Sequence, residues 1–337
     1  MPTTNRRWVL ASRPDGKPTA ENFRLEEVEL ADPGEHDLLI EAIYSSIDPG
    51  MRSRLSTDSN AAALQVGDVL ARAMLWEVAE SHNDKSAVGD LVTGGFGWQS
   101  HALSNGRGLA NLDASMFQGP LRVTAAIGVL GIPGLTSYFG LQDLGKPQEG
   151  ETVLISSAAG PVGATAGQIA KMKGCRTVGI AGSKEKCAYV TGDLGFDACI
   201  NYKEVANLED AIKGACPDGV DIYFDNVGGE MLDAAIANTN ERARIIISGA
   251  VSEYNKAEPR GIRNTLRFIT HRLRMEGLVV FDYFKQFRDA QAEMGGWIMQ
   301  NKLIYTEDIS EGLETAPAAF AGLFEGENFG RRLVKVS

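Results

Sequence analysis

Short apolar runs alternate with amphipathic stretches through most of the second half of the chain. The run Thr152–Ser156 is apolar and β-branched, as expected of a buried parallel strand, and the stretch after it reads as a helix that ends at Lys173-Gly174. The same alternation recurs, so strands are expected near 152–156, 176–181, 198–202, 220–225, 243–248 and 275–281, and helices near 161–173, 184–194, 207–215, 229–238, 261–271 and 284–300. Six strands separated by helices predict an α/β fold with a doubly wound parallel sheet.

The first part of the chain has a different texture, with short strand-like runs separated by turns. Strands are expected at 8–10, 23–28 and 38–44. Helices are expected over Ala125–Leu130 and Thr136–Leu141, on either side of Pro133-Gly134. The tail returns to mixed texture with a helix near 312–325 and a strand at 332–336, and we expect it to complete the N-terminal β domain. The predicted domains are 1–124 and 298–337 for the β domain and 125–297 for the α/β domain.

Composition narrows the class of protein. The chain has 337 residues, 44% of them hydrophobic, and a formal net charge of −11, with no basic cluster dense enough for a nucleic-acid face. It has no run of 18 apolar residues and no signal-peptide segment, so we expect a cytoplasmic protein without a membrane span. The four cysteines form no C-x-x-C pair and the four histidines no H-E-x-x-H motif, which predicts a reduced, metal-free protein.

A turn of small residues, Ser157–Gly163 (SAAGPVG), joins the first predicted strand of the sheet to its helix. Gly160 is expected to permit a tight turn and Gly163 to let the helix begin close to a pyrophosphate, which the N–H groups at a helix start can bind. Ala158 replaces the first glycine of the G-x-G-x-x-G motif, so an ordinary strand-to-helix turn is the alternative.

The end of the next predicted strand bears on the type of dinucleotide. An NAD enzyme carries an acidic residue there for the ribose 2′-hydroxyl, whereas this chain has Gly182–Lys186 (GSKEK). A hydroxyl and two lysines suit a 2′-phosphate, which a carboxylate would repel. NADP is therefore favoured over NAD; the alternative is that the lysines are only solvated residues at a helix start.

Several segments together match one known family. They are YSSIDPGMR (44–52), GVLGIPGLTSYFG (128–140), AAGPVG (158–163), GSKEK (182–186), NYK (201–203), FDNVGG (224–229), SGAVSEYN (248–255), RMEGLVV (274–280) and ENFG (327–330). On these segments the chain resembles the zinc-independent medium-chain dehydrogenase/reductases, in the branch of leukotriene hydroxydehydrogenase, prostaglandin reductase and alkenal double-bond reductases. The resemblance implies a Rossmann sheet inserted into a mostly β, GroES-like domain.

The resemblance also implies which residues contact NADP(H). The pyrophosphate would lie on Gly160, Pro161, Val162 and Gly163, and the 2′-phosphate on Lys186 and Tyr202, with Ser183 nearby. Asn226 would lie beside the ribose, and the nicotinamide end would be flanked by Ser248, Gly249, Ala250, Val251, Ser252, Tyr254, Leu278, Val279 and Val280. Asn328 matches a tail residue that reaches the cofactor. For Asn226 and Asn328 the alternative is capping of loop backbone groups.

The reaction implied by the resemblance is hydride transfer from NADPH to the β-carbon of an α,β-unsaturated aldehyde or ketone, followed by protonation of the enolate. Tyr254 is the expected hydrogen-bond donor to the carbonyl oxygen, since tyrosine hydroxyls are protonated at neutral pH. Its alternative role is to line the pocket or stack on the nicotinamide. The metal site is expected to be absent, because the Gly-His-Glu segment and cysteine ligands of the zinc-dependent relatives are missing.

The substrate slot is expected to include Tyr44, Met51 and Arg52 from the β domain, Tyr254, and Tyr283 from the α/β domain. Tyr44 could equally be a core aromatic residue, and Arg52 part of a structural ion pair. The resemblance further implies a homodimer formed through edge strands of the α/β domain. Two other functions stay open: an NADPH quinone oxidoreductase, and a non-catalytic NADPH-binding structural protein.

Overall fold

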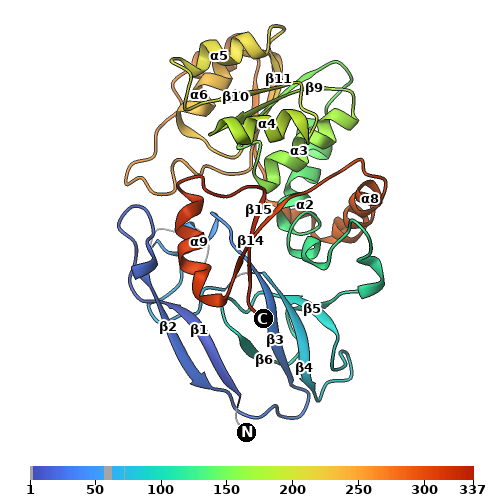
Figure 1. The fold of residues 1–337 in the computed structure, drawn as a ribbon. Coiled ribbons are helices and arrows are strands. Elements are labelled where there is room, and N and C mark those ends of the chain that lie inside the picture. The colour runs from blue at the N-terminus through green and yellow to red at the C-terminus, as the bar shows by residue number, and fades with distance from the viewer. Residues whose placement is uncertain (1–2, 57–62, 72) are drawn as a thin grey trace. The chain divides into compact units, whose positions relative to one another are not determined.

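The computed structural model describes residues 3–56, 63–71 and 73–337, and the chain divides into two compact units (Figure 1). Unit 1 comprises Met1–Ile127, Glu307–Asn328 and Arg332–Ser337, and unit 2 comprises Gly128–Thr306 and Phe329–Arg331. Within the described residues, no helix has both the length and the apolar character needed to cross a membrane.

A six-stranded parallel sheet forms the centre of unit 2. Its strands, in spatial order, are β10 (Ala198–Asn201), β9 (Arg176–Ala181), β8 (Thr152–Ser156), β11 (Val220–Asp225), β12 (Thr239–Ile247) and β13 (Arg274–Gly277). The helices that connect them are α3 (Pro161–Met172), α4 (Lys184–Gly192), α5 (Leu208–Ala215), α6 (Gly229–Ala237) and α7 (Thr265–Thr270). This order confirms the predicted doubly wound sheet, and it reverses direction between β8 and β11, where such sheets bind ligands at the carboxyl ends of the strands.

Helices cover both faces of this sheet. Val153 and Ile155 of β8 pack in one apolar cluster with Ile169 of α3, whereas the intervening Leu154 packs in a second cluster with Ile212 of α5. Because successive strand residues point to opposite faces, the apolar run was readable as a strand buried on both sides.

The segment around Pro133 and Gly134 differs from the sequence prediction. Pro133 and Gly134 do not separate two helices; they lie in the first turn of α2 (Ile132–Phe139), where the missing proline N–H costs no hydrogen bond. A Cβ on Gly134 would lie 1.6 Å from the carbonyl oxygen of Val129, so glycine is required there for close packing. Of the helix expected over Ala125–Leu130, only residues 125–127 are helical, as the end of a short 3-10 helix over Val123–Ile127 in unit 1.

The last strand of the sheet is shorter than expected. β13 ends at Gly277, and a 3-10 helix over Val280–Gln286 and helix α8 (Phe287–Met299) follow. Instead of continuing the strand, Val280 is buried in an apolar cluster with Leu135 and Phe139.

Unit 1 is built mainly from antiparallel strands. Its seven-stranded sheet has the order β14 (Glu307–Glu311), β15 (Arg331–Lys335), β3 (Leu38–Ser46), β4 (Met74–Ser81), β5 (Leu91–Gly94) and β7 (Leu109–Asn111), with β6 (His101–Ser104) also paired to β3. A two-stranded sheet joins β1 (Thr4–Leu10) to β2 (Phe23–Glu29), and the short helices are α1 (Met51–Arg54) and α9 (Ala316–Leu323). β15 pairs with β3 with Leu333 opposite Ser46, so the C-terminal strand completes the sheet begun by the N-terminal segment.

Candidate active site

The turn after β8 has its left-handed residue at a serine. Ser157 has φ +52°, whereas Gly160 has φ −82° and ψ 167°, which any residue adopts. The Gly160 N–H donates to the Ser157 carbonyl oxygen at 2.9 Å and closes the turn. The tight backbone therefore depends on Ser157, which the sequence analysis did not single out.

Gly163 packs the start of α3 directly against this turn. A Cβ at Gly163 would lie 2.4 Å from the Ser157 carbonyl oxygen and 2.8 Å from the Cα of Ala158. The glycine is thus needed for the approach of the helix to its own turn. α3 begins at Pro161, so the first N–H groups of the helix, at Val162 and Gly163, lack carbonyl partners within the helix, and can bind an anion.

The C-terminal tail is hydrogen-bonded to the same turn. The Gly330 N–H donates to the Ala159 carbonyl oxygen at 3.0 Å, and Phe329 packs against Tyr189 of α4. Asn328, the predicted cofactor contact, immediately precedes these residues and belongs to unit 1. Its contact with the cofactor stays a prediction.

The predicted 2′-phosphate corner combines the start of α4 with the end of β10. The Ser183 side chain caps α4 and accepts a hydrogen bond from the Lys186 N–H at 3.2 Å. Tyr202 is 43% exposed, and its ring lies against Gly182, where a Cβ would be 3.1 Å from ring atom Cε1. Segments that are some 20 residues apart thus meet at one exposed corner.

A hydrogen-bonded network joins the carboxyl ends of β8, β11 and β12. Asn226 donates from Nδ2 to the Ser156 carbonyl oxygen at 2.8 Å, and its N–H donates to Ser156 Oγ at 2.8 Å. Ser248 Oγ donates to Asn226 Oδ1 at 2.6 Å. This network holds Asn226 and Ser248 together, and gives Asn226 the backbone-capping role that was its alternative in the sequence.

Asp225 lies beneath this network and has no exposed surface. Its Oδ1 accepts hydrogen bonds from Ser156 Oγ at 3.1 Å and from Tyr223 Oη and the N–H groups of Val227 and Gly228 at 2.9 Å each. Burial raises the pKa of the Asp225 carboxyl, and these hydrogen bonds offset the rise only in part. Burial likewise raises the pKa of Tyr223 well above its usual range.

The loop after β12 folds back over the end of β11. The Ser248 N–H donates to the Asp225 carbonyl oxygen at 2.9 Å, and the Ser252 N–H donates to that of Val227 at 3.1 Å. Gly249, Ala250 and Val251 lie between these two anchors. All five predicted contact positions from 248 to 252 therefore lie along one stretch at the carboxyl edge of the sheet.

Tyr254 turns its hydroxyl group back toward this stretch. Its Oη accepts a hydrogen bond from the Ala250 N–H at 3.2 Å, and a Cβ on Gly249 would lie 3.3 Å from that oxygen. Since the backbone N–H supplies its own proton, the hydroxyl proton of Tyr254 stays available to an acceptor.

The residues after β13 split into buried and exposed positions. The Leu278 N–H donates to the Ile247 carbonyl oxygen at 2.9 Å, so Leu278 lies beside the end of β12. Val280 is 6% exposed, while Val279 is 56% exposed. Their contacts with a nicotinamide stay predictions.

Tyr283 has well-defined partners within unit 2. Its hydroxyl donates to Asp143 Oδ2 at 2.6 Å, and its ring stacks on Phe139 with centroids 4.5 Å apart. Partial burial, together with the Asp143 carboxylate, raises the pKa of Tyr283 to about 12. The substrate contact predicted for Tyr283 would have to compete with this hydrogen bond.

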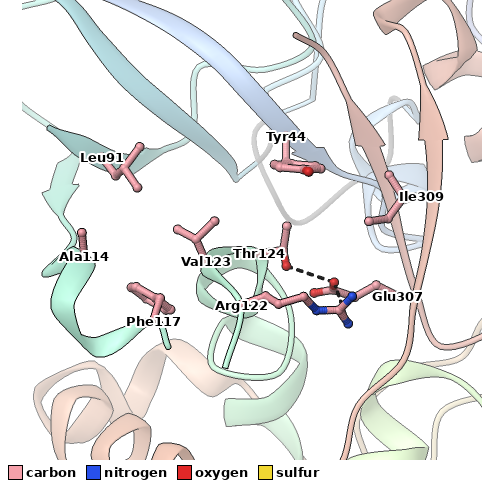
Figure 2. Close-up of a pocket in the computed structure, with 9 residues that line it drawn as sticks. All are labelled: Tyr44, Leu91, Ala114, Phe117, Arg122, Val123, Thr124, Glu307 and Ile309. Carbon is pink, nitrogen blue, oxygen red and sulfur yellow. Dashed lines mark hydrogen bonds and ion pairs between the residues drawn. The ribbon is translucent and has the colours of Figure 1, made fainter. Parts of the chain in front are cut away.

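Tyr44 lines a pocket of about 450 Å³ in unit 1 (Figure 2). The other lining residues are Leu91, Ala114, Phe117, Arg122, Val123, Thr124, Glu307 and Ile309. The buried carboxylate of Glu307 forms an ion pair with Arg122 at 3.1 Å and accepts a hydrogen bond from Thr124 Oγ1 at 3.0 Å. Tyr44 is thus at a pocket wall, as well as beside the apolar cluster that includes Leu75.

The other two substrate candidates of unit 1 are not among the residues that line this pocket. Met51 is 2% exposed and packs in the core with Ile47 and Leu55. Arg52 is 7% exposed and donates from Nη2 to the Gly16 carbonyl oxygen at 3.0 Å, and burial lowers its pKa. Within unit 1, both side chains stabilise the fold, and a substrate contact for either stays a prediction.

Sequence reasoning missed Ser156 and Asp225, which organise the carboxyl edge. Each is a polar residue in the last position of a buried strand, and that position was the available signal. Among residues 3–56, 63–71 and 73–337, no group of three or more His, Cys, Asp or Glu side chains could hold a metal ion.

Two family models match the chain. Residues 6–112 match the model described as the N-terminal domain of oxidoreductase, and residues 161–294 match the model described as zinc-binding dehydrogenase. The NADPH-dependent curcumin reductase of Escherichia coli (strain K12) is 44% identical, over 99% of this chain and 97% of that protein. Prostaglandin reductase 1 of Rattus norvegicus is 42% identical, over 97% of this chain and 98% of that protein.

Solved structures agree with these matches. The crystal structure of CurA in complex with NADPH from Vibrio vulnificus aligns with a TM-score of 0.91 and 39% identity, over 98% of this chain and 99% of that chain. The Escherichia coli quinone oxidoreductase complexed with NADPH aligns with a TM-score of 0.77 over 99% of this chain and all of that chain, but at 20% identity, so that likeness extends to the fold alone.

Proposed function

We propose that this chain uses NADPH to reduce the carbon–carbon double bond of α,β-unsaturated aldehydes and ketones. The chain belongs to the zinc-independent medium-chain dehydrogenase/reductase family, in the branch of the prostaglandin and alkenal reductases. Relatives that match over nearly the whole chain at 42–44% identity are named as reductases, one of them as NADPH-dependent. The observation that carries the catalytic part is the Tyr254 hydroxyl, which accepts from the Ala250 N–H and keeps its own proton for a substrate oxygen.

The geometry of unit 2 fits the cofactor. The turn from Ser157 to Gly163 would hold the pyrophosphate at the start of α3, and the corner of Ser183, Lys186 and Tyr202 would hold the 2′-phosphate. When bound, NADPH supplies the hydride. Asn226 and Ser248 would fix the ribose and the nicotinamide end through their shared network.

Tyr254 would act on the substrate carbonyl. As the hydride reaches the β-carbon, the double-bond electrons move to the carbonyl oxygen, and the negative charge there is stabilised by the Tyr254 O–H. The enolate then takes one proton at the α-carbon, so the substrate gains one hydride and one proton overall. The Ala250 N–H holds the phenol oxygen in place during both steps.

Steady-state kinetics of Tyr254→Phe on a panel of enals, enones and quinones test the proposal. We expect NADPH-dependent loss of the enone absorbance, and a turnover number reduced roughly 100-fold in the variant, with NADPH affinity within about 2-fold. Tyr138→Phe, which loses a hydroxyl bonded to Glu293 elsewhere in unit 2, is the matched control. Full activity of Tyr254→Phe would remove Tyr254 from the chemistry, turnover of quinones alone would favour a quinone oxidoreductase, and NADPH binding without any turnover would favour a structural protein.

A second copy of this chain is the partner we propose for the β13 edge of the sheet. All four residues of β13 are exposed at this edge, and exposed apolar side chains flank it, including Ile269, Phe281 and Phe284 at 75%, 63% and 71% exposure. Light scattering should give a dimer for the wild type and a monomer for Phe281→Asp, and a monomeric wild type would contradict the proposal. The cytoplasmic location stays a prediction.

A further inference from the structure

The turn after β10, which carries Tyr202 and Lys203, lies against Gly182, the residue that follows β9. A Cβ built on Gly182 would lie 3.1 Å from Tyr202 Cε1, 3.3 Å from Tyr202 Oη and 3.4 Å from Lys203 Cε. The aliphatic stem of Lys203 therefore runs beside the tyrosine ring, over the glycine that precedes the Ser183 cap of α4. This places the Lys203 ammonium group at the corner where the start of α4 also presents Lys186.

The charged side chains of this corner differ in whether they have a hydrogen-bond or ion-pair partner. Lys184 pairs with Glu204, with Nζ 3.5 Å from Oε1. Glu185 interacts with the Ser183 hydroxyl and the helix-start backbone, and these hydrogen bonds lower its pKa. Among the described residues, Lys203 Nζ has no carboxylate or hydrogen-bond partner.

We infer that Lys203 is a further specificity-determining residue, whose ammonium group binds the 2′-phosphate of NADPH together with Lys186 and Tyr202. This inference rests on the proposed NADPH-dependent function. A phosphate group has three terminal oxygens and nearly two negative charges at neutral pH, so it can accept several charged donors at once. A cation without a carboxylate partner gains most from such a ligand, because it has no ion pair to break.

A lysine without a carboxylate partner at this corner would help the protein to discriminate between NADPH and NADH. NADH has a neutral hydroxyl in place of the phosphate, so a solvated lysine at this corner adds little to NADH binding. Lys203 should therefore contribute to the affinity for NADPH and add very little to the affinity for NADH. Its contribution should weaken as the salt concentration rises.

The inference is tested by titration calorimetry, which measures the binding of NADPH, NADH and adenosine 2′-monophosphate to the full chain. We expect Lys203→Gln to weaken the binding of NADPH and of adenosine 2′-monophosphate about 5- to 20-fold, while the affinity for NADH changes less than 2-fold. Lys203→Arg should restore most of the affinity, because the charge is kept. Lys184→Gln removes the same charge from the same corner, but from a lysine matched by Glu204, and should weaken NADPH no more than about 2-fold.

Lys186→Ala separates failure of this inference from failure of the proposed function. If Lys186→Ala weakens adenosine 2′-monophosphate and Lys203→Gln does not, Lys203 makes no phosphate contact and the inference is overturned while the NADPH site stands. If neither variant changes the preference for NADPH over NADH, the 2′-phosphate site itself is wrong. Equal losses in Lys203→Gln and Lys184→Gln would show only a general effect of charge, and would also overturn the inference.

Discussion

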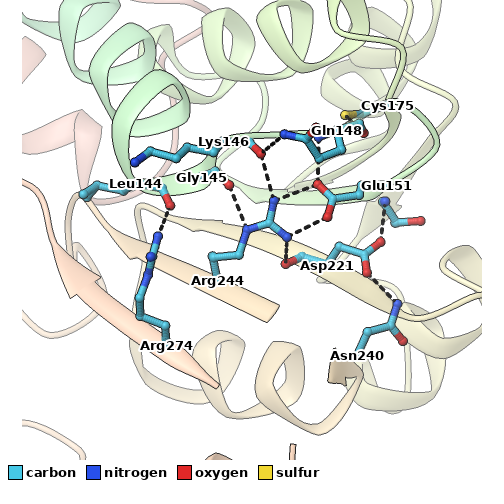
Figure 3. Close-up of polar contacts among 11 residues, drawn as sticks. Leu144, Gly145, Lys146, Gln148, Glu151, Cys175, Asp221, Asn240, Arg244 and Arg274 are labelled. Atoms are coloured by element: carbon cyan, nitrogen blue, oxygen red, sulfur yellow. Dashed lines mark hydrogen bonds and ion pairs between the residues drawn. The ribbon is translucent and has the colours of Figure 1, made fainter. Parts of the chain in front are cut away.

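The two edges of the parallel sheet in unit 2 hold their polar side chains in opposite ways. At the amino edge, Arg244 forms a two-pronged ion pair with Glu151, with both N–O distances 2.7 Å, and donates from Nε to the Gly145 carbonyl oxygen at 2.8 Å (Figure 3). Arg274 donates to the Leu144 carbonyl oxygen beside it. These arginines satisfy the last carbonyls of the π-helix over Gly140–Gly145, so the charges of this edge are bound to the protein's own backbone.

The carboxyl edge uses short neutral side chains instead. Ser156, Asn226 and Ser248 bond to one another and to the backbone, and no ion pair joins them. The carboxyl group of Asp225, at the end of β11, is buried beneath the loop. The comparison indicates that the amino edge contributes stability, whereas the carboxyl edge fixes the positions of hydroxyl and amide groups that our proposal assigns to the cofactor site.

Breaking the amino edge should give the largest change in stability. Arg244→Met leaves the Glu151 carboxylate, whose side chain is 22% exposed, without its guanidinium partner, and should lower the free energy of unfolding by about 2–4 kcal/mol. The melting temperature should fall by roughly 5–10 °C while the turnover number at 25 °C stays within about 2-fold. Differential scanning fluorimetry and steady-state kinetics measure the two effects.

Arg272→Gln is the control for this variant, because it removes an ion pair with Glu241 in which the two side chains are 50% and 64% exposed. Its cost should stay below about 1 kcal/mol. A melting temperature of Arg244→Met equal to that of the control would mean that the amino edge does not stabilise unit 2.

A substitution at the carboxyl edge should reverse the pattern, with a smaller effect. Ser248→Ala removes the 2.6 Å hydrogen bond to Asn226 Oδ1 and leaves that amide held only through Nδ2, so we expect NADPH affinity to fall about 5-fold. The melting temperature should change by less than about 2 °C. Thr270→Ala, which loses an exposed hydroxyl bonded to the Leu266 carbonyl oxygen, is the control. A loss of stability with unchanged NADPH binding would contradict the division between the edges.

The sequence predicted one edge better than the other. Buried β-branched runs and glycine stops were enough to predict the strands and the doubly wound sheet. The family resemblance predicted cofactor or substrate contacts for Asn226, Ser248 and Tyr254, which follow strands at the carboxyl edge. The amino edge was missed, because Arg244 and Glu151 are ordinary charged residues 93 positions apart in the chain, and their pairing depends on strand register.

Local exceptions had other causes. The helix through Pro133 and the left-handed Ser157 depend on close backbone contacts with Val129 and Gly163, which no local pattern reveals. The family motif predicted Met51 as a substrate contact, but within unit 1 its side chain is buried in the core.

The smallest effect we expect is an opposite pH dependence of the two edges. Burial tends to raise the pKa of Glu151, but hydrogen bonds from Arg244 and from the Gln148 N–H outweigh it, and the net shift is downward. A carboxyl group with a lowered pKa contributes stability that is present above its unfolded pKa and is lost as pH falls through the folded value. The pKa of Asp225 is raised, so its charged form carries a penalty at neutral pH that is relieved as pH falls through the raised value.

Melting temperatures of the wild type, Glu151→Gln and Asp225→Asn across pH 4–7.5 measure the two contributions separately. The advantage of the wild type over Glu151→Gln should shrink toward the acid end, because the protonated glutamate no longer attracts Arg244. The wild type should instead gain relative to Asp225→Asn over the same range, because the buried aspartate becomes neutral. If both differences moved in the same direction with pH, the ion-paired edge and the neutral edge would not differ in the way that their hydrogen bonds indicate.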